Sequence, residues 1–330
     1  MKKNVITASL LKGLAVASLA LGLLPAAQAA DLEKIKLAVF PSVTALPYYI
    51  AQSHGLFKEA GLEVEEVPVT SHPLTVQAIV SGSIDGAANL VTLEGANIES
   101  RRADTLRYIS LNGQNEEFRV EQFVARSGSG IEKLTDIKGG LKLFSAPGPA
   151  NIGSAREVLK KAGLKEGEDF TIQEQAVGMH LSVLQAGTFD GGYTLEPAAT
   201  MMVSQDVATR VEAGVIATYL LDNKDGNAFA TGTALSSRFM SERPEAAKRF
   251  AEVWAKAIAI AETDENTRTD LAAGMRIPME LASAVPLSNM IMVADLNAEH
   301  LSDFQKFISL GQRLGVLRDT MDAQSLLHAY

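Results

Sequence analysis

The sequence predicts an α/β protein with two Rossmann-like lobes, two hinge crossings of the chain that join them, and a ligand cleft between them. Two observations support this fold class. One β-α-β-α-β unit occurs twice along the chain, and segments with strand character lie between and after the two copies. Strands that alternate with helices of this length are typical of parallel sheets.

The two copies share the same succession of elements. Each begins with an apolar strand-like run, continues with a helix that closes in Ala-Gly-Leu, and ends in a Gly-x-apolar-Asp-Gly element. The runs are residues 35–41 and 141–147, and the closing elements are residues 82–86 and 187–191.

The first helices of the two copies are predicted over residues 47–60 and 151–162. The second of these has apolar residues at the spacing i, i+3, i+6, i+7, which places them on one face of a helix. Gly61 and Gly163 follow the two helices. We expect both glycines to end them in the left-handed conformation.

Two segments are predicted to cross between the lobes. Residues 106–124 have strand character before a Ser-Gly-Ser-Gly turn, and residues 214–221 are strand-like before a polar loop at 222–226. If the chain crosses at both places, lobe one is discontinuous. Lobe one then comprises residues 31–119 plus 224–330, and lobe two comprises residues 120–223.

The C-terminal third is predicted to be mostly helical. Apolar residues recur at helical spacing over residues 244–262, and the apolar stripe includes Trp254, which we expect in the core. Ser241 is the expected N-cap, with Pro244 in the first turn. A last helix is predicted over residues 298–314.

Residues 1–29 have the pattern of a cleavable secretory signal peptide. Lys2 and Lys3 give a basic start, residues 13–24 form an apolar core, and residues 27–29 are a small-x-small cleavage motif. No later stretch has 18 uninterrupted apolar residues, so we expect the mature chain to be soluble. The absence of cysteine excludes disulfides and a lipid on a terminal cysteine. These features predict a free protein of the bacterial periplasm.

Charge and motifs exclude several functions. The net charge of −9 becomes −12 in the mature chain, because the signal carries three lysines and no acidic residue. An acidic chain does not favour nucleic acid or anionic lipid. No G-x-S-x-G elbow, H-E-x-x-H helix or phosphate-binding P-loop occurs. We therefore expect a binding protein with no catalytic residue and no cofactor.

Five segments resemble the nitrate-, taurine- and alkanesulfonate-type substrate-binding proteins of ABC importers. They are residues 51–65 (AQSHGLFKEAGLEVE), 129–139 (SGIEKLTDIKG), 147–164, 184–197 (LQAGTFDGGYTLEP) and 237–259 (SRFMSERPEAAKRFAEVWAKAIA). The resemblance implies a type II periplasmic binding fold, in which a two-lobed monomer captures a small solute and delivers it to a permease in the inner membrane. A solute sensor for a membrane receptor is an alternative. The related vitamin-pyrimidine synthases rely on a cysteine-rich motif that this chain lacks.

Ligands of open α/β sheets bind outside the carboxyl ends of the strands, close to helix N-termini. This rule selects the loops at 42–49, 71–73, 147–153 and 178–180, and the segments 89–92 and 193–197. The candidate ligand-binding residues are Thr44, Tyr48, His72, Asn89, Thr92, Asn151, Ile152, Gly153, His180, Tyr193 and Glu196.

The loop at 147–153 is the most specific of these signals. It opens a helix, so the N–H groups of Asn151, Ile152 and Gly153 carry the positive end of the helix dipole and suit a carboxylate, sulfonate or phosphate. The alternative is an ordinary proline-started helix whose first N–H groups meet water. Many relatives carry Gly-Ser-Thr where this chain has Gly-Pro-Ala at residues 148–150. The two hydroxyl groups are absent, which shifts the contact to backbone donors or to a different ligand.

The remaining candidates each have a structural alternative. Glu196 accepts from a ligand amine or amide, or it pairs with a lysine or caps a helix. Tyr193, and one of Tyr48 and its neighbour, stack on a ligand ring or pack in the core. His72 and His180 lie in equivalent loops and are expected to contact the solute. With Glu196 they would make a metal site, but their spacing is not a metal pattern and no metal is expected.

Asp85 and Asp190 are the most symmetric charged pair. An aspartate at a turn accepts hydrogen bonds from nearby backbone N–H groups, so we expect both to be structural.

The expected solute follows from the anion-binding helix start and Glu196. The first favours an anionic head, and the second favours a donor elsewhere on the solute. A small anionic or zwitterionic organic molecule, such as taurine or another sulfonate, or nitrate is therefore expected. An aromatic carboxylate or a pyrimidine vitamin precursor is the alternative.

Overall fold

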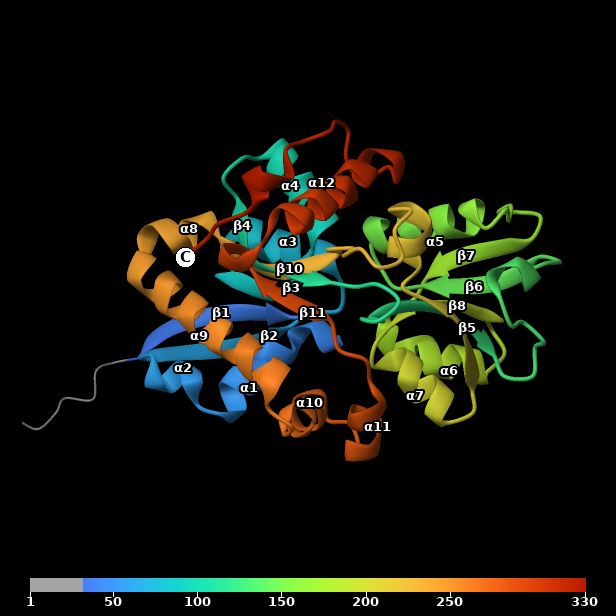
Figure 1. Cartoon of the computed structure of the whole chain (residues 1–330), viewed down its shortest axis with the longest axis horizontal. Helices are drawn as coiled ribbons and strands as arrows, with labels where there is room; N and C mark the ends of the chain where they lie inside the picture. Colours follow the sequence, from blue (N-terminus) through green and yellow to red (C-terminus); the bar gives the residue numbers. More distant parts are fainter. Residues whose placement is uncertain (1–31) are drawn as a thin grey trace, which may run out of the picture. The chain divides into compact units, whose positions relative to one another are not determined.

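A computed structural model describes residues 32–330, so the predicted signal peptide lies outside the described part of the chain. The described residues form two separate β-sheets with helices packed on their faces (Figure 1). The predicted α/β fold with two sheets is confirmed. Among the described helices, none is both long enough and apolar enough to cross a membrane.

The first sheet has the strand order β11-β4-β10-β3-β1-β2. Its strands are β1 (Glu33–Val39), β2 (Leu62–Pro68), β3 (Gly86–Val91), β4 (Leu106–Gly113), β10 (Thr231–Ser236) and β11 (Asn289–Met292). The second sheet has the order β7-β6-β8-β5-β9. Its strands are β5 (Glu121–Arg126), β6 (Leu141–Ser145), β7 (Phe170–Glu174), β8 (Gly191–Leu195) and β9 (Ala208–Ala213). We keep the names lobe one and lobe two for the predicted residue sets, whose boundaries remain a prediction.

The duplicated unit is visible in the pairing of the strands. In the first sheet β1 lies between β2 and β3 and is parallel to both, and in the second sheet β6 lies between β7 and β8 and is parallel to both. Each unit is extended by an antiparallel strand, β10 next to β3 and β5 next to β8. Strands β10 and β5 each follow a chain crossing, so each crossing continues directly into a strand of the sheet that it reaches.

Helices cover both faces of the first sheet (Figure 1). Apolar side chains of α1, α2 and α9 form one core with β1, and those of α3, α4 and α12 form part of another. Trp254 of α9 is buried, as predicted, and donates its indole N–H to Ser110 Oγ at 3.2 Å. The helices are α1 (Leu46–Ser53), α2 (Leu56–Glu59), α3 (His72–Ser81), α4 (Thr92–Arg101), α5 (Pro149–Lys161), α6 (His180–Gln185), α7 (Ala198–Ser204), α8 (Ser237–Glu242), α9 (Pro244–Thr263), α10 (Thr267–Met275), α11 (Met279–Ala284) and α12 (Ala298–Arg313).

One predicted helix is interrupted. The helix expected over residues 47–60 is two helices, α1 and α2, that meet at Gly55. Gly55 has φ +70°, a left-handed conformation that glycine adopts without a steric penalty and that ends a helix. Leu56 and Phe57 are nevertheless buried, so the apolar pattern continues across a break in the helix.

The strand expected over residues 214–221 is wrong. Gly214, with φ +66°, ends β9, and Ile216–Leu220 form a single π-helical turn, η4. The N–H of Ile216 donates to Glu121 Oε1 at 2.9 Å, which holds the start of this turn. A short apolar run does not distinguish a strand from a buried helical turn.

The expected N-cap at Ser241 is also wrong. Ser241 lies within the short helix α8, whose cap is Ser236, and the Ser236 hydroxyl accepts from Phe239 N–H at 3.1 Å. Helix α9 begins at Pro244, as predicted, but has no side-chain cap. Only Arg243 separates α8 from α9. Ser241, three residues before Pro244, therefore lies inside α8 and is not the cap of α9.

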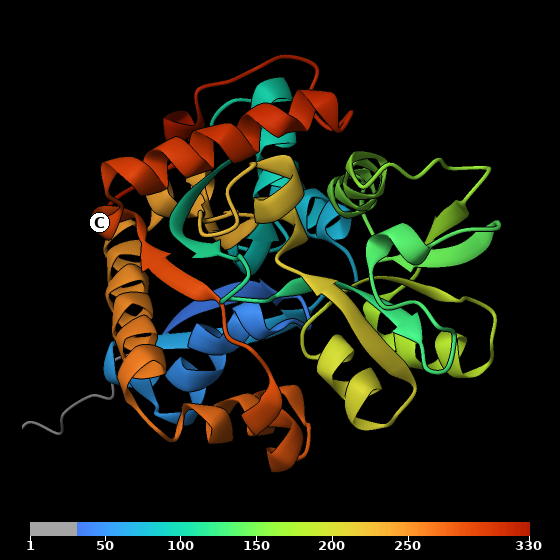
Figure 2. The ribbon, with the colours of Figure 1, turned by 45° about the vertical axis from the view of Figure 1, so that its right-hand side comes forward.

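The two crossings run side by side (Figure 2). Gln114 N–H donates to Ala228 O at 3.2 Å, and Ala228 N–H donates to Gln114 O at 3.0 Å. Asn115 Nδ2 donates to Asp225 O at 3.3 Å. The chain segments that join the sheets are therefore hydrogen-bonded to each other, so a rotation at one crossing involves the other.

Candidate functional site

A small, partly open cavity lies where residues of both sheets meet. Its volume is about 20 Å³, which has room for about one water molecule. The wall contains no lysine, arginine, aspartate or glutamate. It is formed by Phe40, Ser42, Thr44, His72, Val91, Gln114, Val120, Ala150, Asn151, Ser154, Tyr193, Leu195, Ile216, Ala230, Thr231 and Phe307. Of the predicted residues, Thr44, His72, Asn151 and Tyr193 are among these.

Thr44 belongs to a loop that Asn89 holds in place. Asn89 Nδ2 donates to Thr44 Oγ1 at 3.0 Å and to Phe40 O at 2.9 Å, and Asn89 Oδ1 accepts from Phe40 N–H at 3.0 Å. Asn89 itself does not border the cavity. It therefore positions Phe40 and Thr44, which do.

Thr92 has a similar supporting position. Its hydroxyl donates to Phe229 O at 2.7 Å and its N–H donates to Ala230 O at 2.9 Å. Thr92 does not border the cavity, whereas Ala230 and Thr231 do. Asn89 and Thr92, two of the predicted ligand contacts, thus hold wall residues in place but do not border the cavity themselves.

His72 is the first residue of α3 and is 2% exposed. Its ring packs against Phe40 with a centroid distance of 4.4 Å. Its Nδ1 atom is buried and has no hydrogen-bond partner among the described residues. Burial lowers the pKa of His72 to about 3, so the imidazole is neutral at pH 7. The cavity therefore contains a neutral ring with an unused hydrogen-bonding atom.

The start of α5 faces a carboxyl group rather than open space. Ala150 N–H donates to Glu94 Oε1 at 3.3 Å, and Glu94, in the first turn of α4, is 5% exposed. Asn151 borders the cavity and donates its side-chain amide to Pro147 O at 2.8 Å. The helix end predicted to hold a solute anion thus already has an acidic neighbour from the other sheet's helices.

The other two predicted donors of α5 do not border the cavity. Ile152 N–H donates to Gly148 O at 3.1 Å, so it is used within the helix. A Cβ atom added at Gly153 would lie 3.0 Å from Leu314 O, so Gly153 packs against the chain after α12. Both residues line a different hollow, of about 560 Å³, on the side of α5 that carries Arg156. This placement does not support an anion contact by Ile152 or Gly153.

The alternation of side chains along the second sheet separates its predicted residues. Tyr193 and Leu195 of β8 point to the same face and both border the cavity. Thr194 lies between them and points to the opposite face, where His180 bonds to it. Tyr193 therefore belongs to the cavity and His180 does not.

His180 is fully used in a structural role. Its Nε2 donates to Gln175 O at 3.1 Å, and its Nδ1 bonds to the Thr194 hydroxyl at 2.8 Å. Its ring stacks on Phe144 with a centroid distance of 4.2 Å. Burial lowers the pKa of His180 to about 4, which is consistent with a neutral core histidine. The expected ligand contact of His180 is therefore not supported.

Glu196 is likewise a structural residue. It is completely buried, and its carboxylate accepts from Gln122 Nε2 at 2.6 Å, Arg210 Nη2 at 3.0 Å and Thr200 N–H at 3.0 Å. Both carboxylate oxygens are occupied. The alternative predicted for Glu196 was pairing with a lysine or capping a helix. Its basic partner is an arginine, and it accepts from Thr200 N–H in the first turn of α7.

Tyr48 is part of the core of the first sheet. It is 4% exposed, its hydroxyl accepts from Gln52 Nε2 at 3.0 Å, and its ring packs near Tyr49 and Phe57. Neither Tyr48 nor Tyr49 borders the cavity. The core alternative for Tyr48 is thus the one that the packing supports.

The segments selected from the sequence contain half of the sixteen wall residues, and sequence reasoning missed the other half. Gln114, Val120 and Ile216 come from the crossings, Thr231 begins β10, and Phe307 comes from α12. The strand-end rule considers parallel strands, whereas β10 is antiparallel and brings its first residue to the same edge. No local signal marks Phe307, because it reaches the cavity only through the packing of a helix near the C-terminus.

Glu121 lies behind the wall, next to Val120. It pairs with Leu195 across β5 and β8, so it shares the face that carries Tyr193. Glu121 is completely buried, and its Oε2 has no hydrogen-bond partner among residues 32–330. Burial raises the pKa of this carboxyl group to about 8. Glu121 is therefore, after Glu94, a second buried carboxyl group next to the cavity wall, and one of its two oxygen atoms is without a partner among the described residues.

No group of three or more histidine or acidic side chains in the described part of the chain could hold a metal ion. His72 and His180 belong to separate surroundings, one in the cavity wall and the other behind the second sheet. The combination of His72, His180 and Glu196 considered from the sequence is therefore not assembled.

Comparison with known structures places the fold. The alkanesulfonate-binding protein of Xanthomonas axonopodis pv. citri, bound to MOPS, is 18% identical with a TM-score of 0.72, over 91% of this chain and 100% of that one. The periplasmic aliphatic sulphonate-binding protein of Escherichia coli is 16% identical with a TM-score of 0.69, over 90% and 92%. The periplasmic nitrate-binding protein of Synechocystis is 16% identical with a TM-score of 0.67, over 90% and 85%. At these identities the likeness shows the fold.

Sequence comparison gives the family. No curated protein matches the chain. The profile of the NMT1-like family matches residues 28–275, well over half of the 330 residues. The resemblance to nitrate- and sulfonate-type binding proteins is confirmed by this match together with the shared fold. This chain belongs to the NMT1-like family.

Proposed function

We propose that this protein is the periplasmic solute-binding component of an ABC importer. It captures a small organic solute in the cavity and presents it to a permease in the inner membrane. The observation that carries the proposal is a cavity whose wall comes from both copies of the duplicated unit, with Thr44 and His72 from one and Asn151 and Tyr193 from the other. The family and the fold support the same class.

Binding requires the two sheets to separate. A cavity of about 20 Å³ is smaller than any organic solute, so it has to widen before a solute can enter. The paired crossings at Gln114 and Ala228 are where the chain can bend. Solute entry by opening and capture by closing is the hinge motion of a two-lobed binding protein.

Two solute classes are compatible with this proposal. The relatives named above are binding proteins for sulfonates and nitrate, which supports a small anionic or zwitterionic solute. The cavity wall lacks any basic side chain and includes the rings of Phe40, His72 and Tyr193. This composition supports the alternative, a ring-containing solute such as a pyrimidine or an aromatic carboxylate.

A thermal-shift and calorimetry panel tests the proposal. The mature protein is titrated with taurine, methanesulfonate, nitrate, benzoate and 4-aminopyrimidine. A true solute at 100 times its Kd stabilises the fold by about 2.7 kcal/mol. Ala230→Leu, which fills the cavity, should abolish binding, whereas Ala213→Leu at the end of β9, outside the wall, should not. Binding that survives Ala230→Leu contradicts this site.

Small-angle scattering tests the closing motion. With a solute from the panel at saturation, the radius of gyration should fall relative to the empty protein. An unchanged radius at saturation argues for a rigid pocket.

Localisation and partner complete the proposal. We expect export with cleavage after Ala29, so the intact mass of the periplasmic protein should correspond to residues 30–330. We expect a monomer that stimulates solute uptake when it is reconstituted with its permease in vesicles. A solute-dependent response of a membrane receptor without uptake would support the sensor alternative.

A further inference from the structure

Two buried carboxyl groups each accept a hydrogen bond from a residue of the cavity wall. Glu94 of α4 accepts from Ala150 N–H, and Ala150 is part of the wall. Glu121 of β5 accepts from Ile216 N–H, and Ile216 is also part of the wall. Glu94 belongs to predicted lobe one and Glu121 to predicted lobe two. Each carboxyl group is therefore one residue away from the space that a solute would fill.

Neither carboxyl group has a basic partner. No salt bridge involves Glu94 or Glu121 in the described part of the chain. By contrast, the buried carboxylates of Glu99 and Glu196 pair with Arg107 and Arg210. Burying a carboxylate without a counter-charge is unfavourable. A bound solute that carries positive charge or several N–H groups would supply the missing partner.

The wall also contains unused hydrogen-bonding capacity. His72 borders the cavity, and its Nδ1 atom is buried and has no partner among residues 32–330. Glu121 Oε2, behind the wall, is also buried and has no partner among the described residues. Gln114 borders the cavity as well. Buried polar atoms are normally paired, so an unpaired atom that borders a cavity indicates an absent partner.

From these contacts we infer that the cavity selects a solute with a protonated or N–H-rich nitrogen group, such as an amine or amidine, and disfavours one with a free anionic head. The inference rests on the proposed function and names its solute class. Glu94 occupies the helix start of α5 where an anion would bind, and no lysine or arginine borders the cavity. An anionic head would therefore find no cation to pair with and would have to displace Glu94 from this helix start.

The titration behaviour of the two groups is consistent with this selection. Burial raises the pKa of Glu94, with the N–H of Ala150 opposing the shift and Glu174 adding to it. Burial raises the pKa of Glu121 to about 8. A neighbouring cation stabilises the ionised form of a carboxyl group, whereas a neighbouring anion destabilises it.

A series of ring compounds of the same shape and different charge tests the inference. Benzamidine, benzamide, benzoate and benzenesulfonate are titrated calorimetrically at pH 7 into the mature protein. We expect benzamidine to bind at least tenfold more tightly than benzoate and benzenesulfonate, with benzamide between them. A preference for benzenesulfonate or benzoate, or equal affinity across the series, would overturn the inference.

Two isosteric variants and one control assign the preference to the two carboxyl groups. Glu94→Gln and Glu121→Gln keep an oxygen that can accept from Ala150 N–H and Ile216 N–H, so the fold should be retained. Each should reduce the benzamidine-to-benzenesulfonate affinity ratio at least fivefold. Glu99→Gln, on the same helix as Glu94 but paired with Arg107, should leave the ratio unchanged. A ratio unchanged in both Glu94→Gln and Glu121→Gln would overturn the assignment.

The outcomes separate this inference from the proposed function. If sulfonates or nitrate bind and the benzamidine series does not, the inference is overturned and the proposed function stands. If neither this series nor the solute panel binds and no partner permease responds, both are overturned.

Discussion

His72 and His180 occupy equivalent loops of the duplicated unit but have opposite surroundings. His72 is the first residue of α3, and its neutral ring packs against Phe40, which follows β1. His180 is the first residue of α6, and its neutral ring packs against Phe144 of β6. His180 has partners for both ring nitrogens, whereas His72 Nδ1 has none among the described residues. The duplicated sequence pattern therefore contains one structural histidine and one that faces the cavity.

The position of the phenylalanine along the strand explains the difference. Lys36 and Lys142 are equivalent, because each donates its N–H to the aspartate of its own copy. Phe40 follows Lys36 by four residues, whereas Phe144 follows Lys142 by two. At 3.3 Å per residue, Phe40 lies about 7 Å nearer the carboxyl edge of its sheet. The histidine that packs on Phe40 is thus held at the edge, where the cavity is.

The largest expected effect comes from replacing each histidine by phenylalanine, which preserves the ring. His180→Phe leaves the Thr194 hydroxyl and Gln175 O buried without their partner, and it should lower the free energy of unfolding by about 3 kcal/mol. His72→Phe breaks no hydrogen bond of the ring found among the described residues, and it should change the free energy of unfolding by less than about 1 kcal/mol. Urea unfolding of the two variants measures this difference.

Affinity should respond in the opposite way. His72→Phe is expected to weaken binding of the identified solute about tenfold, and His180→Phe should leave it within twofold. Equal losses of stability in the two variants, or a larger loss of affinity in His180→Phe, would contradict the comparison.

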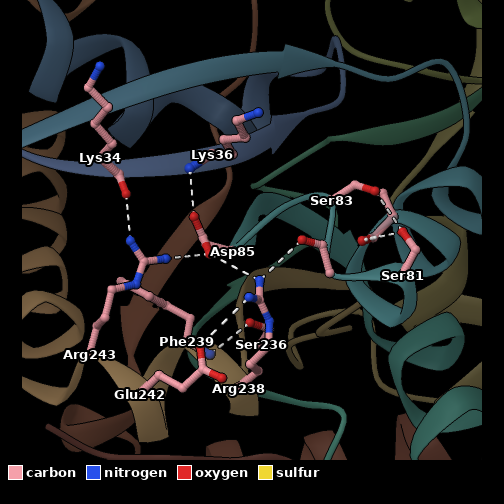
Figure 3. A network of polar contacts seen from close by, with 12 residues as sticks. Lys34, Lys36, Ser81, Ser83, Asp85, Ser236, Arg238, Phe239, Glu242 and Arg243 are labelled. Carbon is pink, nitrogen blue, oxygen red and sulfur yellow. Dashed lines mark hydrogen bonds and ion pairs between the residues drawn. The ribbon is translucent and has the colours of Figure 1, made fainter.

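The aspartates of the two copies provide the second test. Asp85 accepts from Lys36 N–H at 2.9 Å and also contacts Arg238 and Arg243, whereas Asp190 accepts from Lys142 N–H at 2.9 Å and contacts one arginine. Figure 3 shows Asp85 between the backbone of β1 and the two arginines. Asp85→Ala should cost about 2–3 kcal/mol and Asp190→Ala about 1 kcal/mol, measured by thermal unfolding.

Neither aspartate variant should alter solute affinity, because both side chains lie outside the cavity wall. A selective loss of binding in Asp85→Ala or Asp190→Ala would show that these residues act beyond their structural role.

The pH dependence of stability is a third test. The pKa of His72 is lowered to about 3 and that of His180 to about 4, both by burial. Between these values and about 6.5 the unfolded chain binds more protons than the folded one, so stability should rise with pH in this window. Each group contributes at most about 1.4 kcal/mol per pH unit. In denaturant titrations at pH 4 to 7, His72→Phe should reduce the rise.

Glu121 should contribute the opposite slope between about pH 4.3 and 8. Its folded pKa of about 8 exceeds the ordinary glutamate value, so the folded state binds the additional proton and this contribution to stability should fall as the pH rises through the window. Glu121→Gln should therefore flatten the decline between about pH 6.5 and 8 and steepen the rise below about 6.5, where the histidine and Glu121 contributions oppose each other. A decline that is unchanged in the variant would place the responsible group elsewhere.

The smallest expected effect concerns Asn151 at the start of α5. Asn151→Asp loses the amide bond to Pro147 O but places a carboxylate at a helix N-terminus, so stability should change by less than about 1 kcal/mol. Binding should be affected according to charge: an anionic solute should bind more weakly and benzamidine more tightly. Calorimetry of the variant with benzoate and benzamidine distinguishes the two solute classes independently of Glu94 and Glu121.

Most of the architecture was predictable from the sequence. The repeated order of strands, helices and Gly-x-apolar-Asp-Gly elements specified two α/β units, because local periodicity and turn residues act over a few positions of the chain. A structural role for Asp85 and Asp190 was also expected, but their backbone partners are not nearby turn N–H groups: they accept from Lys36 N–H and Lys142 N–H, 49 and 48 residues away in the chain. The edge of the sheets at which the cavity lies was also predictable, since parallel strands bring their carboxyl ends together.

The tertiary structure decided which side chains face that cavity. Glu196, His180 and Tyr48 point into cores or internal networks, because the side chains of a strand alternate between faces and neighbouring helices bury them. Phe307 reaches the wall from a helix far along the chain. Glu94 came to the start of α5 only through the meeting of two units that are separate in the sequence. Such contacts depend on packing between distant segments, which no local pattern encodes.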